Sequence, residues 1–159
     1  MSVKNKINSI NLWLKKNTLI DEKILFIKKF ETGQSNPTFL LKSDNKSFVL
    51  RSKPLGNLLR GAHRIDREYK VMSALSNSKI PTPKMYGYCS DVEIIGSEFY
   101  VMEFINGAHE FDPDLPNYTS EQRDKIYKHK IKILAELVKL DLKKIGLENF
   151  GKPHGYLER

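Results

Sequence analysis

A basic residue stands at the end of a short apolar run in the stretch FVLRSKP, which covers Phe48 to Pro54. A carboxylate, Glu68, follows in a segment whose apolar spacing predicts a helix. A strand that ends in a cation, followed by a helix with a carboxylate beside its buried face, can hold the cation against an anion such as phosphate. We therefore expect Arg51 to point inward, to pair with Glu68 and to be aimed at phosphate.

Two alternatives compete with this pairing. Glu68 lies three residues after Ile65, on or beside the buried face, where an unpaired carboxylate is costly. It could instead pair with Arg64 at the surface, which would leave Arg51 in solvent. Lys53 is a second candidate for the inward cation, because alternation along a strand puts it on the same face as Arg51. Only the depth of the two side chains would then separate them.

A second stretch that could bind an anion is FETGQSNPTF, in which small polar residues follow a glycine. Glycine allows backbone N–H groups to line a phosphate closely. The competing interpretation is an ordinary hairpin loop whose polar side chains are solvated. The residues concerned are Gly33, Gln34, Ser35 and Asn36.

A third stretch, FYVMEFING, is an apolar strand that breaks into a linker near Gly107. Free backbone groups around Glu103 and Ile105 could read the edge of a base such as adenine, and Met102 would line the pocket. The competing interpretation is a core strand followed by a turn. The residues of this candidate contact are Met102, Glu103, Phe104 and Ile105.

Apolar periodicity predicts the elements that would position these residues. The order is helix, three strands, helix, two strands, linker and helix, which is α+β, with an antiparallel sheet and one helix inserted between the third and fourth strands. Thr119 and Gln122 have the spacing of a capping box, which predicts where the last helix begins. The predicted ranges are a helix within 4–17, strands within 23–33, 36–42 and 47–54, a helix within 58–78, strands at 92–95 and 97–107 about a Gly96 turn, and a helix over 119–140.

Composition limits the classes of partner. The 159 residues carry a net charge of +8, but the basic residues are interleaved with acidic ones, so we expect no nucleic-acid partner. No apolar run is long enough for a bilayer span and no signal peptide is evident, so we expect no membrane partner. A single cysteine, Cys89, fits a cytoplasmic location and a buried, unreactive thiol.

Taken in order, several stretches resemble the aminoglycoside-phosphotransferase and choline-kinase superfamily, which has a protein-kinase-like fold. The likeness is closest to the phosphotransferase-like domain fused to some acyl-CoA dehydrogenases, and it covers essentially the whole chain as an amino-terminal part. The stretches are GQSNPTF, FVLRSKP, REYKVMSAL, IPTPKMYGYC, FYVMEFINGA and IYKHKIKILAELVKLDLKKIGLENFG.

The resemblance implies a five-stranded amino-terminal lobe over residues 1–105, and a linker with the start of a helical lobe over 106–159. It implies ATP-dependent phosphoryl transfer to a hydroxyl of a small molecule. Gly33 to Asn36 would cover the phosphates, Arg51 and Glu68 would form the strand-to-helix ion pair, and Glu103 to Ile105 would contact adenine. The partners implied are a nucleotide and, in the full-length protein, a hydroxyl acceptor.

One departure from the family pattern bears on activity. The family's catalytic His-x-Asp loop and metal-binding Asp are absent, since no His-x-Asp occurs in the sequence. We therefore expect no catalytic and no metal-binding residue in this chain, and Mg²⁺ only in a complete two-lobe protein, of which this would be a truncated piece. The alternative is a non-catalytic, kinase-like binding or regulatory module completed by a partner chain through the apolar helix over 119–140. The acceptor is not indicated by the sequence.

Overall fold

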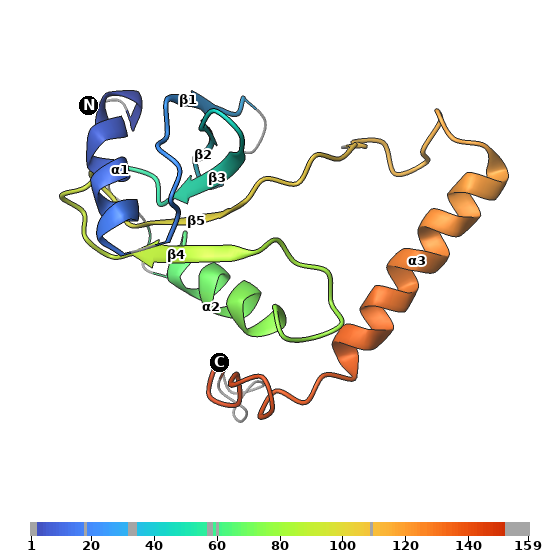
Figure 1. Cartoon of the computed structure of the whole chain (residues 1–159). Coiled ribbons are helices and arrows are strands. Elements are labelled where there is room, and N and C mark those ends of the chain that lie inside the picture. Colours follow the sequence, from blue (N-terminus) through green and yellow to red (C-terminus); the bar gives the residue numbers. More distant parts are fainter. Residues whose placement is uncertain are drawn as a thin grey trace. The chain divides into compact units, whose positions relative to one another are not determined.

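The computed structural model describes residues 3–17, 19–31, 35–56, 59, 61–108 and 110–151. The chain divides into two compact units. The first comprises Met1–Ser73 and Pro83–Phe104, and the second Ala74–Thr82 and Ile105–Arg159. Figure 1 shows the elements of both, and each unit is described by itself below.

The first unit is built on a five-stranded, wholly antiparallel sheet in the order β1-β2-β3-β5-β4. One helix, α2 (Ile65–Leu75), begins in the connection between β3 and β4. The predicted α+β class, with five antiparallel strands and one inserted helix, is confirmed. The strands are β1 (Phe26–Lys29), β2 (Thr38–Lys42), β3 (Ser47–Ser52), β4 (Met85–Cys89) and β5 (Phe99–Glu103).

The fourth strand lies earlier in the chain than predicted. The prediction placed it at 92–95, but these residues form a turn in which the Gly96 N–H donates to the Val92 carbonyl at 2.7 Å. The Asp91 carboxylate accepts from the Glu93 N–H at 2.9 Å and so stabilises this turn. The strand is instead Met85–Cys89, which the prediction had placed in an extended connector.

Helix α1 (Ile7–Lys16), preceded by a 3₁₀ turn at Val3–Lys6, covers one face of the sheet. Alternation along β2, β3 and β5 sends every second side chain to this face, where they meet the apolar stripe of α1. Trp13 packs edge-on against Phe99, with ring centroids 4.9 Å apart. The buried cluster comprises Ile10, Leu14, Ile20, Ile24, Ile27, Phe39, Leu41, Phe48, Leu50, Cys89, Ile95, Phe99 and Val101.

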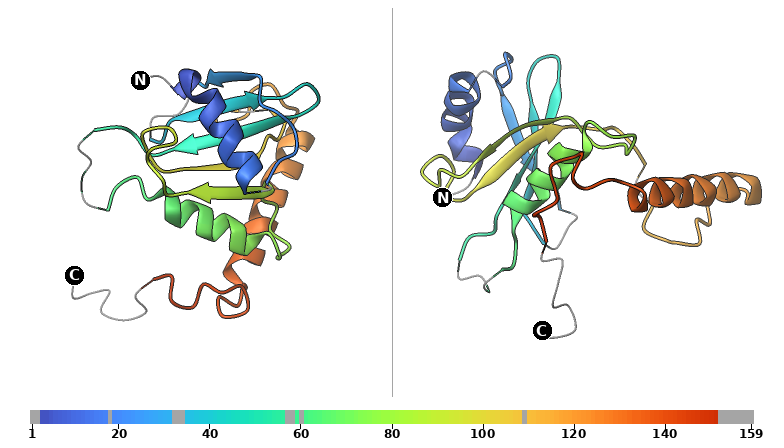
Figure 2. Two further views of the ribbon diagram at one scale, coloured as in Figure 1. Left: turned by 60° about the vertical axis from the view of Figure 1, so that its left-hand side comes forward. Right: turned by 90° about the horizontal axis from the view of Figure 1, so that it is seen from below.

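Helix α2 lies on the opposite face of the sheet from α1 (Figure 2). Its first residue, Ile65, is fully buried, and Tyr69 packs against the rings of Tyr88 and Tyr100 at centroid distances of 5.7 and 6.1 Å. The side chains of β3 and β5 that alternate with the core residues therefore face α2. This second face is the one that holds the candidate site.

The second unit contains α3 (Ser120–Val138). Its predicted capping box is present: the Thr119 hydroxyl accepts from the Gln122 N–H at 3.2 Å, and the Gln122 side chain accepts from the Thr119 N–H at 2.8 Å. No residue of α3 is buried. Within the described parts of the chain, no helix combines the length and the apolarity that a bilayer span requires.

Two leucines on α1 test how the core is built. Leu14 is 1% exposed and Leu12 is 69% exposed. We expect Leu14→Ala to lower the free energy of unfolding by about 2–5 kcal/mol, because it leaves a cavity against the sheet. The matched change Leu12→Ala should cost about 0.5 kcal/mol or less. Urea unfolding followed by circular dichroism measures both, and equal losses would contradict the packing described.

Candidate functional site

The predicted pair between strand and helix is present. Arg51 Nε donates to Glu68 Oε2 at 2.9 Å, and the two side chains are 28% and 36% exposed. Alternation along β3 explains the direction of Arg51, because Phe48 and Leu50 enter the α1 core and Arg51 is turned to the α2 face. The pairing of Arg51 with Glu68 is confirmed, and its aim toward phosphate stays a prediction.

Register places two further side chains in line with Arg51. Thr38 of β2 and Tyr100 of β5 are its partners across the sheet. Arg51 Nη1 donates to the Thr38 hydroxyl at 3.1 Å. A guanidinium has five N–H donors, so these contacts with Glu68 and Thr38 use two of them. The arginine is held by its inner edge and has donors left for an anion.

Glu68 is held by three donors. Tyr100 donates its hydroxyl to Oε2 at 3.1 Å, beside Arg51, and Asn36 donates Nδ2 to Oε1 at 2.8 Å. Burial, followed by the nearby Glu68 carboxylate, raises the pKa of Tyr100, so its phenol keeps the proton that it donates. A carboxylate that accepts hydrogen bonds from three sides is fixed in orientation as well as in position.

The loop before β2 contributes differently from the prediction. Asn36 is 4% exposed, and its side chain contacts Glu68 and His63, so it is not a solvated loop residue. Ser35 is exposed. Gly33 and Gln34 lie outside the described residues, and their expected contact with phosphate stays a prediction.

Both alternative pairings are wrong. Lys53 pairs with Glu98, with Nζ 3.8 Å from Oε1, and the other carboxylate oxygen accepts from the Tyr88 hydroxyl at 2.8 Å. Arg64 makes a two-pronged contact with Asp66, at 2.8 Å and 2.6 Å. The two strand cations have similar exposure, 28% for Arg51 and 32% for Lys53, so partners rather than depth distinguish them.

An apolar row lies beside the polar one on the same face. Register aligns Leu40 of β2, Val49 of β3 and Met102 of β5, each two residues from Thr38, Arg51 and Tyr100 respectively. Two residues along a strand span about 7 Å. A fixed cation at that distance from an apolar surface suits a ligand with an anionic group and a flat, weakly polar ring.

The predicted base contact is in part occupied by the protein. The Glu103 N–H donates to the Lys84 carbonyl at 2.8 Å, and the Glu103 carboxylate accepts from the Lys84 N–H at 3.0 Å. The Glu103 N–H is therefore engaged with β4 and not open to a ligand. Phe104 is half-buried at the end of the first unit, and Ile105, which begins the second unit, is 61% exposed.

Three residues of the site were not singled out from the sequence: Thr38, His63 and Tyr100. Thr38 and Tyr100 could have been found from strand alternation once the register with Arg51 was known. His63 could not, because it lies in a loop and reaches Asn36, 27 positions away in sequence. Its φ of 54° lies in the left-handed region and carries no sequence signal for histidine.

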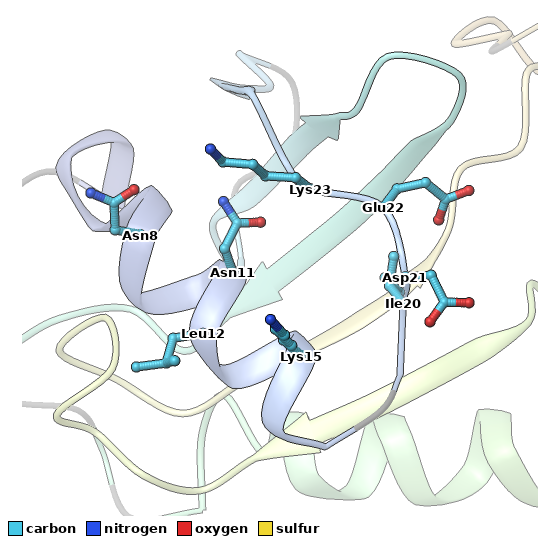
Figure 3. Close-up of a pocket in the computed structure, with 8 residues that line it drawn as sticks. All are labelled: Asn8, Asn11, Leu12, Lys15, Ile20, Asp21, Glu22 and Lys23. Atoms are coloured by element: carbon cyan, nitrogen blue, oxygen red, sulfur yellow. The ribbon is translucent and has the colours of Figure 1, made fainter.

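A separate cavity of about 690 Å³ lies between α1 and the segment that follows it (Figure 3). Its charged side chains are of both signs, and none of the predicted site residues lines it. Across the described residues, no three His, Cys, Asp or Glu side chains are grouped so that they could hold a metal ion. The cavity is lined by Asn8, Asn11, Leu12, Lys15, Ile20, Asp21, Glu22 and Lys23.

An antiparallel sheet whose third strand carries a cation, held by a carboxylate on the inserted helix, defines a lobe of the protein-kinase-like class. The model of the phosphotransferase enzyme family, APH, matches residues 27–159, and the chain belongs to this family. A solved structure from Ralstonia eutropha, whose name places it with the aminoglycoside phosphotransferases, superposes with a TM-score of 0.81 at 34% identity. The superposition covers 96% of this chain and 44% of that one.

Longer relatives carry a different name. A probable acyl-CoA dehydrogenase of Arabidopsis thaliana is 44% identical over 138 residues, which are 84% of this chain and 17% of the relative. Human acyl-CoA dehydrogenase family member 11 is 43% identical over 138 residues, 87% of this chain and 18% of the relative. The chain thus spans less than a fifth of the length of these relatives, and the resemblance to a fused phosphotransferase-like domain is confirmed.

A double-mutant cycle on Arg51→Ala and Glu68→Ala tests the ion pair. We expect a coupling free energy of about 1 kcal/mol in urea unfolding, because the pair is charge-assisted but one third exposed. The control cycle uses Lys46 and Glu22, whose contact at 2.6 Å involves a lysine that is 62% exposed. Coupling no larger for Arg51 and Glu68 than for the control would contradict the geometry described.

Proposed function

We propose that this chain is the nucleotide-binding part of an ATP-dependent phosphotransferase, which transfers a phosphoryl group to a hydroxyl of a small molecule. The observation that carries the proposal is the Arg51–Glu68 pair on the face of the sheet beside the apolar row of Leu40, Val49 and Met102. ATP has both parts that this surface suits: anionic phosphates for the cation and a flat purine for the apolar row. The shown family membership supports the same class of reaction.

In this proposal each predicted residue has a role. Arg51 neutralises nucleotide phosphate and Glu68 orients it. Backbone N–H groups of Gly33 to Asn36 cover the phosphates, since the Asn36 side chain is already engaged with Glu68 and His63. The adenine lies near Met102, and its polar edge meets the backbone from Glu103 to Ile105 through groups other than the Glu103 N–H.

Catalysis and Mg²⁺ binding are assigned to residues outside this sequence. Phosphoryl transfer depends on a metal ion that bridges the β- and γ-phosphates and on a carboxylate that positions the acceptor hydroxyl. The described residues offer no group of carboxylates for such a metal, and no His-x-Asp occurs in the sequence. We propose residues 1–105 as the nucleotide-binding lobe and 106–159 as the linker and first helix of a second lobe.

A second candidate function is a kinase-like binding module that acts without catalysis and is completed by a partner chain. The observation that favours it is the exposed apolar side of α3, a surface that suits a protein partner. The full-length protein that turns over ATP with a hydroxyl acceptor would support the first proposal, and one that binds a partner and never turns over ATP would support the second. The exposed residues are Tyr127, Ile131, Leu134, Leu137 and Val138.

Arg51→Ala and Lys53→Ala in the full-length protein separate the proposed phosphate contact from general basicity. Both remove one positive charge from the same strand and face. We expect Arg51→Ala to raise the Kd for ATP, measured with Mg²⁺ by calorimetry, by about 10- to 100-fold, because charge-assisted hydrogen bonds are lost. Lys53→Ala should change it by about twofold or less. Equal effects of the two changes would exclude the proposed role of Arg51.

A further inference from the structure

We propose that His63 is a positioning residue, which holds Glu68, and through it Arg51, by way of the buried side chain of Asn36. The inference deepens the proposed function and rests on it for its consequence in nucleotide binding. The four side chains form a continuous series: His63 Nδ1 lies 2.8 Å from Asn36 Oδ1, Asn36 Nδ2 lies 2.8 Å from Glu68 Oε1, and Arg51 Nε lies 2.9 Å from Glu68 Oε2.

The chemistry of the groups fixes the direction of each hydrogen bond. The Glu68 carboxylate, which also faces Arg51, only accepts, so Asn36 must present its Nδ2 donor to it. Asn36 Oδ1 is then the atom that faces His63, and an amide oxygen only accepts. His63 must therefore carry a proton on Nδ1. The tautomer of the histidine follows from a carboxylate with which it makes no direct contact.

Burial makes this series matter for the position of Glu68. Asn36 is 4% exposed, so its amide cannot readily replace a lost partner with water. A buried amide with an unmade hydrogen bond costs free energy, and rotation of the Asn36 side chain would relieve it. Such a rotation would remove the donor from Glu68 Oε1 and leave the carboxylate held only on the Arg51 side. His63 thus locks the orientation of the amide.

The backbone of His63 supports a special role for its side chain. Its φ of 54° lies in the left-handed region, which costs a histidine energy and suits glycine or asparagine better. The residue stands directly before α2, and its carbonyl accepts from the Ile65 N–H at 2.9 Å. Its ring therefore anchors the start of α2 to the loop before β2, on the helix that carries Glu68.

Two substitutions separate the hydrogen bond from the backbone strain. His63→Asn keeps an N–H donor near the position of Nδ1, and His63→Gly removes the side chain, while both residues tolerate the left-handed backbone. The readout is the NMR signal of the Arg51 side-chain Nε–H in the full-length protein. We expect this signal to shift and to exchange faster with water in His63→Gly and to stay close to wild type in His63→Asn. The Nε–H signal of Arg64, which donates to Asp66, is the internal control and should stay unchanged in both variants.

The consequence for nucleotide is measured on the same proteins. We expect the Kd for ATP with Mg²⁺ to rise about 3- to 10-fold in His63→Gly, as befits one lost neutral hydrogen bond, and to stay within about twofold of wild type in His63→Asn. Asn36→Leu should act like His63→Gly, and Asn45→Leu, at an exposed turn, should have no effect. Nitrogen-15 shifts of the wild-type His63 ring, recorded where the ring is neutral, should show Nδ1 protonated and Nε2 bare.

The outcomes distinguish the two proposals. An Arg51 signal that is unchanged in His63→Gly, or a His63 ring protonated on Nε2 alone, overturns the positioning role whatever the ATP affinity. An Arg51 signal that moves as expected while ATP affinity does not change supports the positioning role and contradicts the proposed contact between Arg51 and the nucleotide. Equal losses in His63→Gly and His63→Asn also overturn the inference, because the donor would then be irrelevant.

Discussion

The Glu68 carboxylate, placed between a helix and a sheet, is the constraint on which the rest of the candidate site depends. It is only partly in solvent, so its charge must be balanced by groups that the fold supplies. Arg51, Tyr100 and Asn36 supply three donors, and they come from β3, β5 and the loop before β2. Because one acceptor ties these segments together, a change in any of them reaches the arginine.

The two faces of the sheet divide the work of the first unit. Alternation along β3 sends Phe48 and Leu50 into the core under α1 and Arg51 to the face of α2. The α1 face is closed by apolar packing and gives the sheet its stability. The α2 face keeps half-exposed side chains in register, with a polar row through Arg51 and an apolar row through Val49. A rigid scaffold on one side thus allows a charged, partly open surface on the other.

Most of the fold was predictable because period and capping act locally. The capping box at Thr119 and the inserted helix were found, and the pairing of Arg51 with Glu68 followed from the cost of an unpaired carboxylate. The fourth strand was misplaced because the apolar residues at 92–95 form a turn, whereas Met85–Cys89 offers only weak alternation around Gly87. At Gly87 a β-carbon would lie 2.5 Å from a Leu19 methyl carbon, a packing constraint that no local pattern reveals. The contact between His63 and Asn36 was equally out of reach, because it joins two loops through tertiary structure.

The most direct test of this account is a crystal structure of the full-length protein with a non-hydrolysable ATP analogue and Mg²⁺. The account predicts phosphate oxygens within hydrogen-bonding distance of the Arg51 guanidinium, with Nε still on Glu68 and the purine against Val49 and Met102. A nucleotide bound elsewhere, with Arg51 in contact only with Glu68 and Thr38, would contradict it.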